Sequence, residues 1–230
     1  MHSGSRLLSY VQLLDSALPI GGFSHSFGLE TYVQNGQIQN MQQLEEFIRS
    51  QIHSNLVRLD GMVMKGIYTA IVQDDLWKLC LLDKIIHIQR TPRESREGMH
   101  KMGKRLLKLA RTLYPWMDFK PLEKSFAQYG GYGSLPTIHA WISYHLEVDA
   151  DEAVKGYLYS SVVTMVNSAL RLMSIGQTDG QVLIQKLISV IDSEWEAACK
   201  EPVDHLHSFS LAHEIHSMNH ETLYSRLFMS

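Results

Sequence analysis

The chain has 230 residues, of which 45% are hydrophobic and 20% are charged, and its formal net charge is −3. This is the composition of an ordinary globular protein that can bury its own core, and the lack of a basic excess argues against nucleic acid as a partner. Two cysteines give no disulfide framework, and no apolar run reaches the roughly 18 residues of a membrane span. We therefore expect a soluble, cytoplasmic protein without membrane contact.

The first third of the chain predicts consecutive helices. Apolar residues recur every three or four positions, whereas the alternating pattern of a strand is nearly absent. The spacing predicts a first helix that ends at Pro19, a second that follows Asn40 as its N-cap and reaches residue 57, and two more over residues 61–72 and 75–88.

The middle of the chain combines a helix with an irregular stretch. Thr91 followed by Pro92 predicts a cap with proline at the first helical position, and that helix should stop before Pro115. Residues 114–136 are rich in glycine and proline, so only a short helix over 122–129 is expected there.

The last third predicts the most apolar helix and a further long one. Asp149 or Asp151 starts the first, Gly176 closes it, and Gly180 opens the next, which ends before Pro202. The pattern as a whole predicts an all-α fold: one domain over residues 1–230, a bundle of about eight to ten helices.

The turn after the first helix combines three glycines with two phenylalanines. Proline and glycine there force a tight turn, and the two aromatic rings offer anchors. We expect an ordered turn, packed on the core through Phe23 and Phe27, in which the glycines hold backbone angles or close approaches that a Cβ would hinder. The structural residues of this turn are Pro19, Gly21, Gly22, Phe23 and Gly28.

Three sequence patterns that could indicate phosphate binding, metal binding or catalysis are incomplete. Residues 98–104 have phosphate-loop spacing, but Arg105 stands where the magnesium-binding hydroxyl is needed. His213, His216 and His220 would share a helical face and could bind nickel or zinc, yet no further ligand completes the set, and a solvated or partner-facing surface is favoured. Ser24, His25 and Ser26 lack a nucleophile elbow. We therefore expect no catalytic residue, no metal site and no cofactor.

Four segments in order along the chain resemble the urease accessory protein F family. These are residues 18–30, the Arg-Thr-Pro-Arg-Glu-Ser-Arg run at 90–96 with Gly103 after it, the Asn-Ser-Ala-Leu-Arg-Leu run at 167–172 with Gly-Gln-Thr-Asp-Gly-Gln at 176–181, and the ending at 220–230. The stretch 130–146 departs from the family pattern, so the resemblance assigns it no role.

The resemblance implies a non-enzymatic adaptor in nickel-urease maturation. Family members dimerise, bind accessory protein D (or H), and recruit the nickel-carrying GTPase G to apo-urease, acting in metallocentre assembly as a chaperone for nickel insertion. Two alternatives stay open. The chain regulates that GTPase, with Arg93, Arg96 or Arg171 acting in trans, or it carries nickel on its C-terminal histidines.

The resemblance also predicts where partners bind. Residues 221–230 are expected to be mobile in the free chain and helical in the complex, with their apolar residues on one face. A homodimer is expected through the apolar stripes of 41–57 and 154–173, which exceed what one small bundle can bury. The predicted partner-binding residues are Glu30, Arg171, Gln177, His220, Leu223, Tyr224, Arg226, Leu227 and Phe228.

Overall fold

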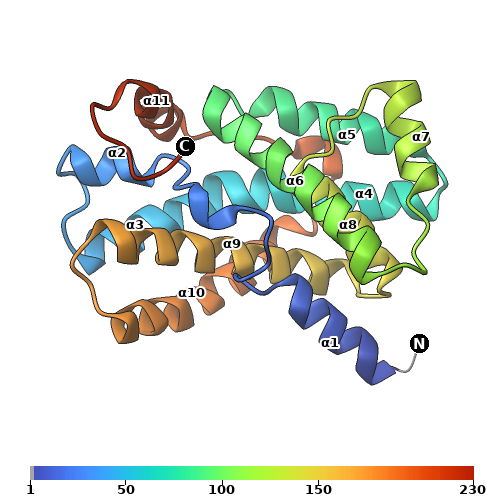
Figure 1. Cartoon of the computed structure of the whole chain (residues 1–230), viewed down its shortest axis with the longest axis horizontal. Helices are drawn as coiled ribbons and strands as arrows, with labels where there is room; N and C mark the ends of the chain where they lie inside the picture. The colour runs from blue at the N-terminus through green and yellow to red at the C-terminus, as the bar shows by residue number, and fades with distance from the viewer. Residues whose placement is uncertain (1–2) are drawn as a thin grey trace.

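Helices account for the regular structure of this computed structural model, which describes residues 3–230 and contains no β-strand in that range. The all-α prediction is confirmed. The α-helices, labelled in Figure 1, are α1 Ser3–Leu13, α2 Leu29–Gln34, α3 Met41–Gln51, α4 Met62–Val72, α5 Leu76–Gln89, α6 Arg93–Leu113, α7 Lys120–Tyr129, α8 Leu135–His145, α9 Ala150–Leu172, α10 Gln177–Ala198 and α11 Leu211–Asn219.

The core forms around α4, which packs against α5, α8 and α9. Around this centre α6 packs on α8, α9 packs on α10, and α5 packs on α7 (Figure 1). The stripes of 41–57 and 154–173 are buried here, through residues such as Leu44, Ile48 and Leu158. The expectation that these stripes are too many for one bundle is therefore wrong, because the chain buries them itself.

Several helix boundaries follow the sequence closely. Asn40 caps α3 by accepting a hydrogen bond from the amide of Gln43 at 3.0 Å, and Asp149 caps α9 by accepting from the amide of Asp151 at 2.8 Å. The helix before Pro115 ends at Leu113. α10 begins at Gln177, three residues earlier than predicted.

Some helical segments differ from the prediction, and two of them bear on the interior. Between α3 and α4 the chain stays helical, but Ile52–Gly61 is π-helical, which turns Asp60 into the interior. α8 begins at Leu135, immediately after the glycine-rich stretch, and residues 135–143 are all buried. A helix buried on every side has no apolar stripe, so periodicity does not reveal it.

A buried carboxylate organises the approach to α8. Asp83 of α5 accepts hydrogen bonds from the main-chain amides of Tyr132, Gly133 and Ser134 at 2.5, 2.9 and 3.0 Å. It also accepts from the hydroxyls of Ser134 and Thr137, each at 2.7 Å. One side chain thus satisfies the donors of the loop and of the first turn of α8.

Within residues 3–230, no helix combines the length and the apolar character that crossing a membrane requires. α1 leaves the body of the bundle at one end (Figure 1). It is tied back by the Tyr114 hydroxyl, which donates to the main-chain oxygen of Ser9 at 3.2 Å, and by an ion pair between Arg6 and Glu147.

Candidate functional site

Residues 220–230, which we call the C-terminal segment, lie against the turn that precedes α2. The chain leaves α11 through a short 3-10 turn, His220–Thr222, and ends between α11, α2 and α6 (Figure 1). The main-chain oxygen of Ser230 accepts from the amides of Ser26 and Phe27 at 2.6 and 3.0 Å, and the amide of Met229 donates to the oxygen of Ser24 at 2.8 Å. Main-chain hydrogen bonds therefore join residues 24–27 to residues 229–230.

Glu30 in the first turn of α2 holds the middle of this segment. Its carboxylate is buried and accepts from the amides of Leu227 and Phe228 at 2.7 and 3.0 Å. Burial alone would raise the pKa of Glu30, but these hydrogen bonds and one from His220 outweigh it and lower the pKa. The carboxylate is thus fixed in its charged form by the segment that it binds.

His220 lies between two carboxylates. Its Nε2 is 3.0 Å from Oε2 of Glu30, and its Nδ1 is 2.7 Å from Oε2 of Glu94 at the start of α6. Both ring nitrogens of His220 therefore face carboxylate oxygens. Burial alone would raise the pKa of Glu94, but His220 and Arg226, whose Nη1 is 2.7 Å from Glu94, lower it.

An aromatic contact fastens the end of the segment. Phe228 is only 4% exposed, and the guanidinium of Arg171 lies 4.4 Å from the centre of its ring, which is cation–π geometry. The same guanidinium donates to the main-chain oxygen of Phe23 at 2.5 Å. Arg171 therefore connects α9, the turn and the C-terminal segment.

The predicted partner-binding residues thus divide into two groups. Glu30, Arg171, His220, Arg226 and Phe228 hold the segment to its own chain. Leu223 is half-buried, whereas Tyr224 and Leu227 are exposed. Gln177 is exposed at the first residue of α10 and is not part of this network.

The segment is docked in the free chain, contrary to the expected mobile tail, whereas its expected helix in the complex stays a prediction. No helix follows Thr222, and Tyr224 and Leu227 are 106% and 52% exposed, so the apolar residues do not gather on one face. The physical reason is Glu30. It takes the amides of Leu227 and Phe228, which a helix would direct to its own carbonyl groups.

The turn over residues 18–30 is ordered, with one error in its predicted anchors. Phe27 is half-buried and stacks on His25, but Phe23 is 69% exposed, because only its main-chain oxygen is held, by Arg171. Gly21 and Gly28 have φ of +93° and +89°, as expected, whereas Gly22 has room for a Cβ, so the prediction for Gly22 is wrong.

The predicted cap at Thr91 is also wrong. α6 begins at Arg93 with Pro92 as its N-cap residue, and no side chain caps it. The hydroxyl of Thr91 donates instead to Oε2 of Glu214 at 2.7 Å, which ties the start of α6 to α11.

The three C-terminal histidines do not form a solvated face. His213 is buried and His216 half-buried, and both pack on the ring of Tyr32. Burial, with Arg90 nearby, lowers the pKa of His213 to about 4. In the described part of the chain, no group of three or more His, Cys, Asp or Glu side chains is placed to hold a metal ion.

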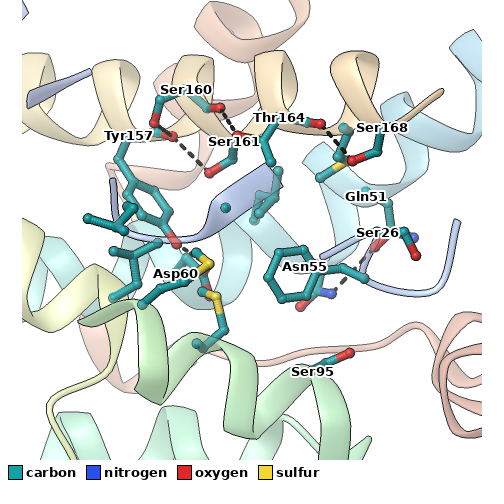
Figure 2. A pocket seen from close by; sticks show the side chains of 18 of the residues that line it. Ser26, Gln51, Asn55, Asp60, Ser95, Tyr157, Ser160, Ser161, Thr164 and Ser168 are labelled. Carbon is teal, nitrogen blue, oxygen red and sulfur yellow. Dashed lines mark hydrogen bonds between the residues drawn. The ribbon is translucent and has the colours of Figure 1, made fainter. Parts of the chain in front are cut away.

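A cavity of about 150 Å³ lies between α9, α6 and the π-helical stretch (Figure 2). At one side Asp60, fully buried, accepts from Arg90 at 2.5 Å and from the Tyr157 hydroxyl at 2.8 Å. Burial raises the pKa of Asp60, and the Arg90 charge opposes that rise. The hydroxyls along α9 donate to carbonyls of their own helix, so this wall offers mainly acceptors; they belong to Ser160, Ser161, Thr164 and Ser168.

Sequence reasoning missed the residues that complete both sites. In the sequence, Asp60 and Tyr157 fit the spacing of a helix, and Glu94 fits an acidic residue in the first turn of a helix. Each acquires its partner only through tertiary packing, from a residue at least 30 positions away. No local signal distinguishes them.

An uncovered apolar surface adjoins the docked segment. Along α11, Leu211, Ile215 and Met218 are spaced four and three apart, so they share the helix face opposite the buried His213 and Ser217. We call the exposed apolar residues of this region the α11 apolar face: Phe209, Leu211, Ile215, Met218, Tyr224 and Leu227.

Comparison with known proteins decides the family. The family model described as UreF matches residues 38–188, which is more than half of the chain. The chain belongs to the UreF family. The match does not reach the turn or the C-terminal segment, but full-length relatives do.

Three relatives illustrate the likeness. The urease accessory protein UreF of Lachnoclostridium phytofermentans is 36% identical, over 97% of this chain and 98% of its own. That of Bacillus sp. (strain TB-90) is 35% identical, over 98% and 100%. The UreF of Actinobacillus pleuropneumoniae is 32% identical, over 98% and 99%. The alignments span nearly the whole chain, so the turn and the segment belong to the shared region.

Proposed function

We propose that this UreF-family chain is a non-catalytic adaptor in urease maturation. In this role it bridges accessory protein D/H and the nickel-carrying GTPase G, so that nickel is delivered to apo-urease in the cytoplasm. The names of its relatives, urease accessory proteins, support the pathway. The observation that carries the adaptor role is the α11 apolar face beside the docked C-terminal segment.

The α11 apolar face fits a protein partner. Its six apolar side chains are exposed on a helix and on the irregular chain on either side of it, and clustered exposed apolar groups usually mark interaction sites. Tyr224 projects fully into solvent, and tyrosine is prominent among residues that dominate binding energy. The hydrogen bonds of Glu30 and His220 fix the backbone beneath it, so a partner meets a preorganised surface.

A second copy of the chain is a further proposed partner. Since the stripes of α3 and α9 are buried, the dimer requires another surface. α1 offers one, because Leu7, Leu8 and Val11 are more than half exposed on one side of that helix.

Regulation of the GTPase is the alternative that the structure favours over nickel carriage. Arg93 is exposed at the start of α6 and held only by the surface carboxylates of Glu221 and Glu97, so it can be released to a partner. His213 and His220, in contrast, are buried and occupied by packing or by carboxylates. GTP turnover by the partner, with the wild type and with Arg93→Ala, measures this alternative.

The test of the adaptor role is copurification with accessory protein D/H. In the variant Tyr224→Asp/Leu227→Asp, charge is placed on the α11 apolar face, and we expect binding to weaken at least about tenfold, since desolvating the new carboxylates opposes association. Both side chains are exposed, so the free energy of unfolding should change by no more than about 0.5 kcal/mol.

The matched control places the same two charges on other exposed apolar side chains. Val72 and Ile88, at the ends of α4 and α5, are 71% and 72% exposed. Val72→Asp/Ile88→Asp should bind as the wild type does. Equal binding by both variants would show that the α11 apolar face is not the partner surface.

A further inference from the structure

Helix α6 carries a strongly basic face. Its exposed side includes five basic residues spaced three or four apart, which places them on one side of the helix over a length of about 15 Å. No acidic residue occurs in α6 after Glu97. We call this the α6 basic face: Lys101, Lys104, Arg105, Lys108 and Arg111.

The ends of this face are neutralised, but its centre is not. Lys101 lies 3.8 Å from Glu97, and Arg111 pairs with Glu123 of α7. Between them, over residues 3–230, no carboxylate lies within 4.0 Å of the ammonium group of Lys104 or Lys108. Two turns of the helix therefore present uncompensated positive charge, although the chain as a whole carries −3.

The chain's own stability does not account for this arrangement. Basic residues favour a helix only near its C-terminal turn, which covers Arg111 but not Lys101 or Lys104. Like charges three or four residues apart destabilise a helix by about 0.2–0.5 kcal/mol per pair. The central residues Lys104 and Lys108, four apart and without a carboxylate partner among residues 3–230, thus oppose the stability of the helix.

We propose that the α6 basic face binds an acidic surface of a protein partner. The inference deepens the proposed function and rests on it, since it adds a second contact site and its chemistry to the adaptor. The carboxylates of Glu97 and Glu123 limit the positive region to about three turns. A compact acidic patch fits that length, whereas a long polyanion would meet the negative charge around it.

Opposite charge attracts the partner to the α6 basic face, and the affinity of the complex depends on the salt concentration. Interactions between exposed charges are screened at high ionic strength, so the contribution of the α6 basic face should be large at low salt and small at high salt. The α11 apolar face should show the opposite dependence on salt. Salt therefore separates the two contact sites in one complex.

The first measurement uses a probe that needs no accessory protein, a fluorescently labelled peptide of five glutamates, whose extended length of about 17 Å matches the α6 basic face. The wild-type chain should bind it at low ionic strength. Lys104→Glu/Lys108→Glu should bind at least about tenfold more weakly, because attraction becomes repulsion. Lys186→Glu/Lys200→Glu, on exposed lysines of α10 and the residues after it, makes the same change in net charge and should bind as the wild type does.

The second measurement repeats these variants in copurification with accessory proteins D/H and G. We expect only Lys104→Glu/Lys108→Glu to lose copurification. At high salt the difference between this variant and the wild type should disappear. If the wild type does not copurify with these accessory proteins, the proposed function is wrong, but peptide binding still tests the α6 basic face. Peptide binding that is absent, or equal in all three proteins, overturns the inference. So does tighter binding to duplex DNA or to vesicles of anionic lipid than to the peptide.

Discussion

Two buried carboxylates each fix an irregular stretch of backbone, and they do so with unequal support. Asp83 binds three consecutive amides of the loop at 132–134, and Glu30 binds two amides of the C-terminal segment. The loop continues into α8, which is buried along most of its length. The segment is instead flanked by exposed residues and is held by contacts to Glu30, Arg171 and the turn at 24–27. We therefore expect the segment to open more readily than the loop.

Removal of Asp83 should have the largest effect. In Asp83→Ala, several buried donors lose their acceptor at once, and we expect the free energy of unfolding to fall by about 3–5 kcal/mol. Urea unfolding followed by circular dichroism measures this change. Asp204→Ala, on an exposed side chain, should change it by less than about 0.5 kcal/mol. If Asp83→Ala also lowers the free energy of unfolding by less than about 0.5 kcal/mol, then α8, and not the carboxylate, holds the loop.

Acidification should weaken the docking of the C-terminal segment. Burial first, then Lys101 and Arg105, lower the pKa of His25 to about 4, and the pKa of His213 is similarly low. Both lie below the ordinary value of 6.5. As the pH falls from 6.5 towards 4, these histidines bind protons in the released state but not in the docked state. Docking then weakens by up to about 1.4 kcal/mol per pH unit for each histidine that becomes exposed on release.

The carboxylates do not add to this effect above pH 4.5. The pKa values of Glu30 and Glu94 are lowered, so their stabilisation is present above their ordinary value of 4.5 and is lost only below it. Hydrogen exchange at pH 7 and pH 5, corrected for intrinsic rates, measures the protection of the amides of Leu227 and Phe228. Unchanged protection of these two amides would contradict the expected weakening.

The last prediction concerns a single charge. In Glu30→Gln the side chain keeps its shape but loses the negative charge shared by His220 and two amides. The opening free energy of the C-terminal segment should fall by about 1.5–3 kcal/mol, the value of hydrogen bonds to a charged group. Exchange of the Leu227 and Phe228 amides should quicken accordingly, with the loop at 132–134 unchanged. Glu46→Gln, on an exposed side chain of α3, serves as the control and should leave both stretches protected.

Local sequence predicted most helices because their signals are local. Asn40 and Asp149 cap helices through atoms two or three residues away, and apolar stripes need only one helix to be recognised. The π-helical stretch escaped, because its apolar residues resemble those of an α-helix over ten positions. α8 escaped because it is buried on all sides, has no apolar stripe and follows glycines.

The candidate site was predictable only in part. The resemblance picked out Glu30, Arg171, His220 and Phe228, but not their roles, since those depend on contacts across the fold. Phe23 illustrates the limit. An aromatic residue in a turn suggests an anchor, yet here the main-chain oxygen is held and the ring is exposed. Which atom of a residue is used cannot be read from its type.

The hydrogen bonds of Glu30 also set an order of events during synthesis of the chain. Its amide partners lie 197 and 198 residues further along, whereas Asp83 finds its partners within 49 to 54 residues. At the usual 5–20 residues per second, Asp83 waits about 2–10 s for the loop, and Glu30 waits about 10–40 s for the segment. During that interval the carboxylate and the turn around it are open on the nascent chain, and the surface built on the segment forms last.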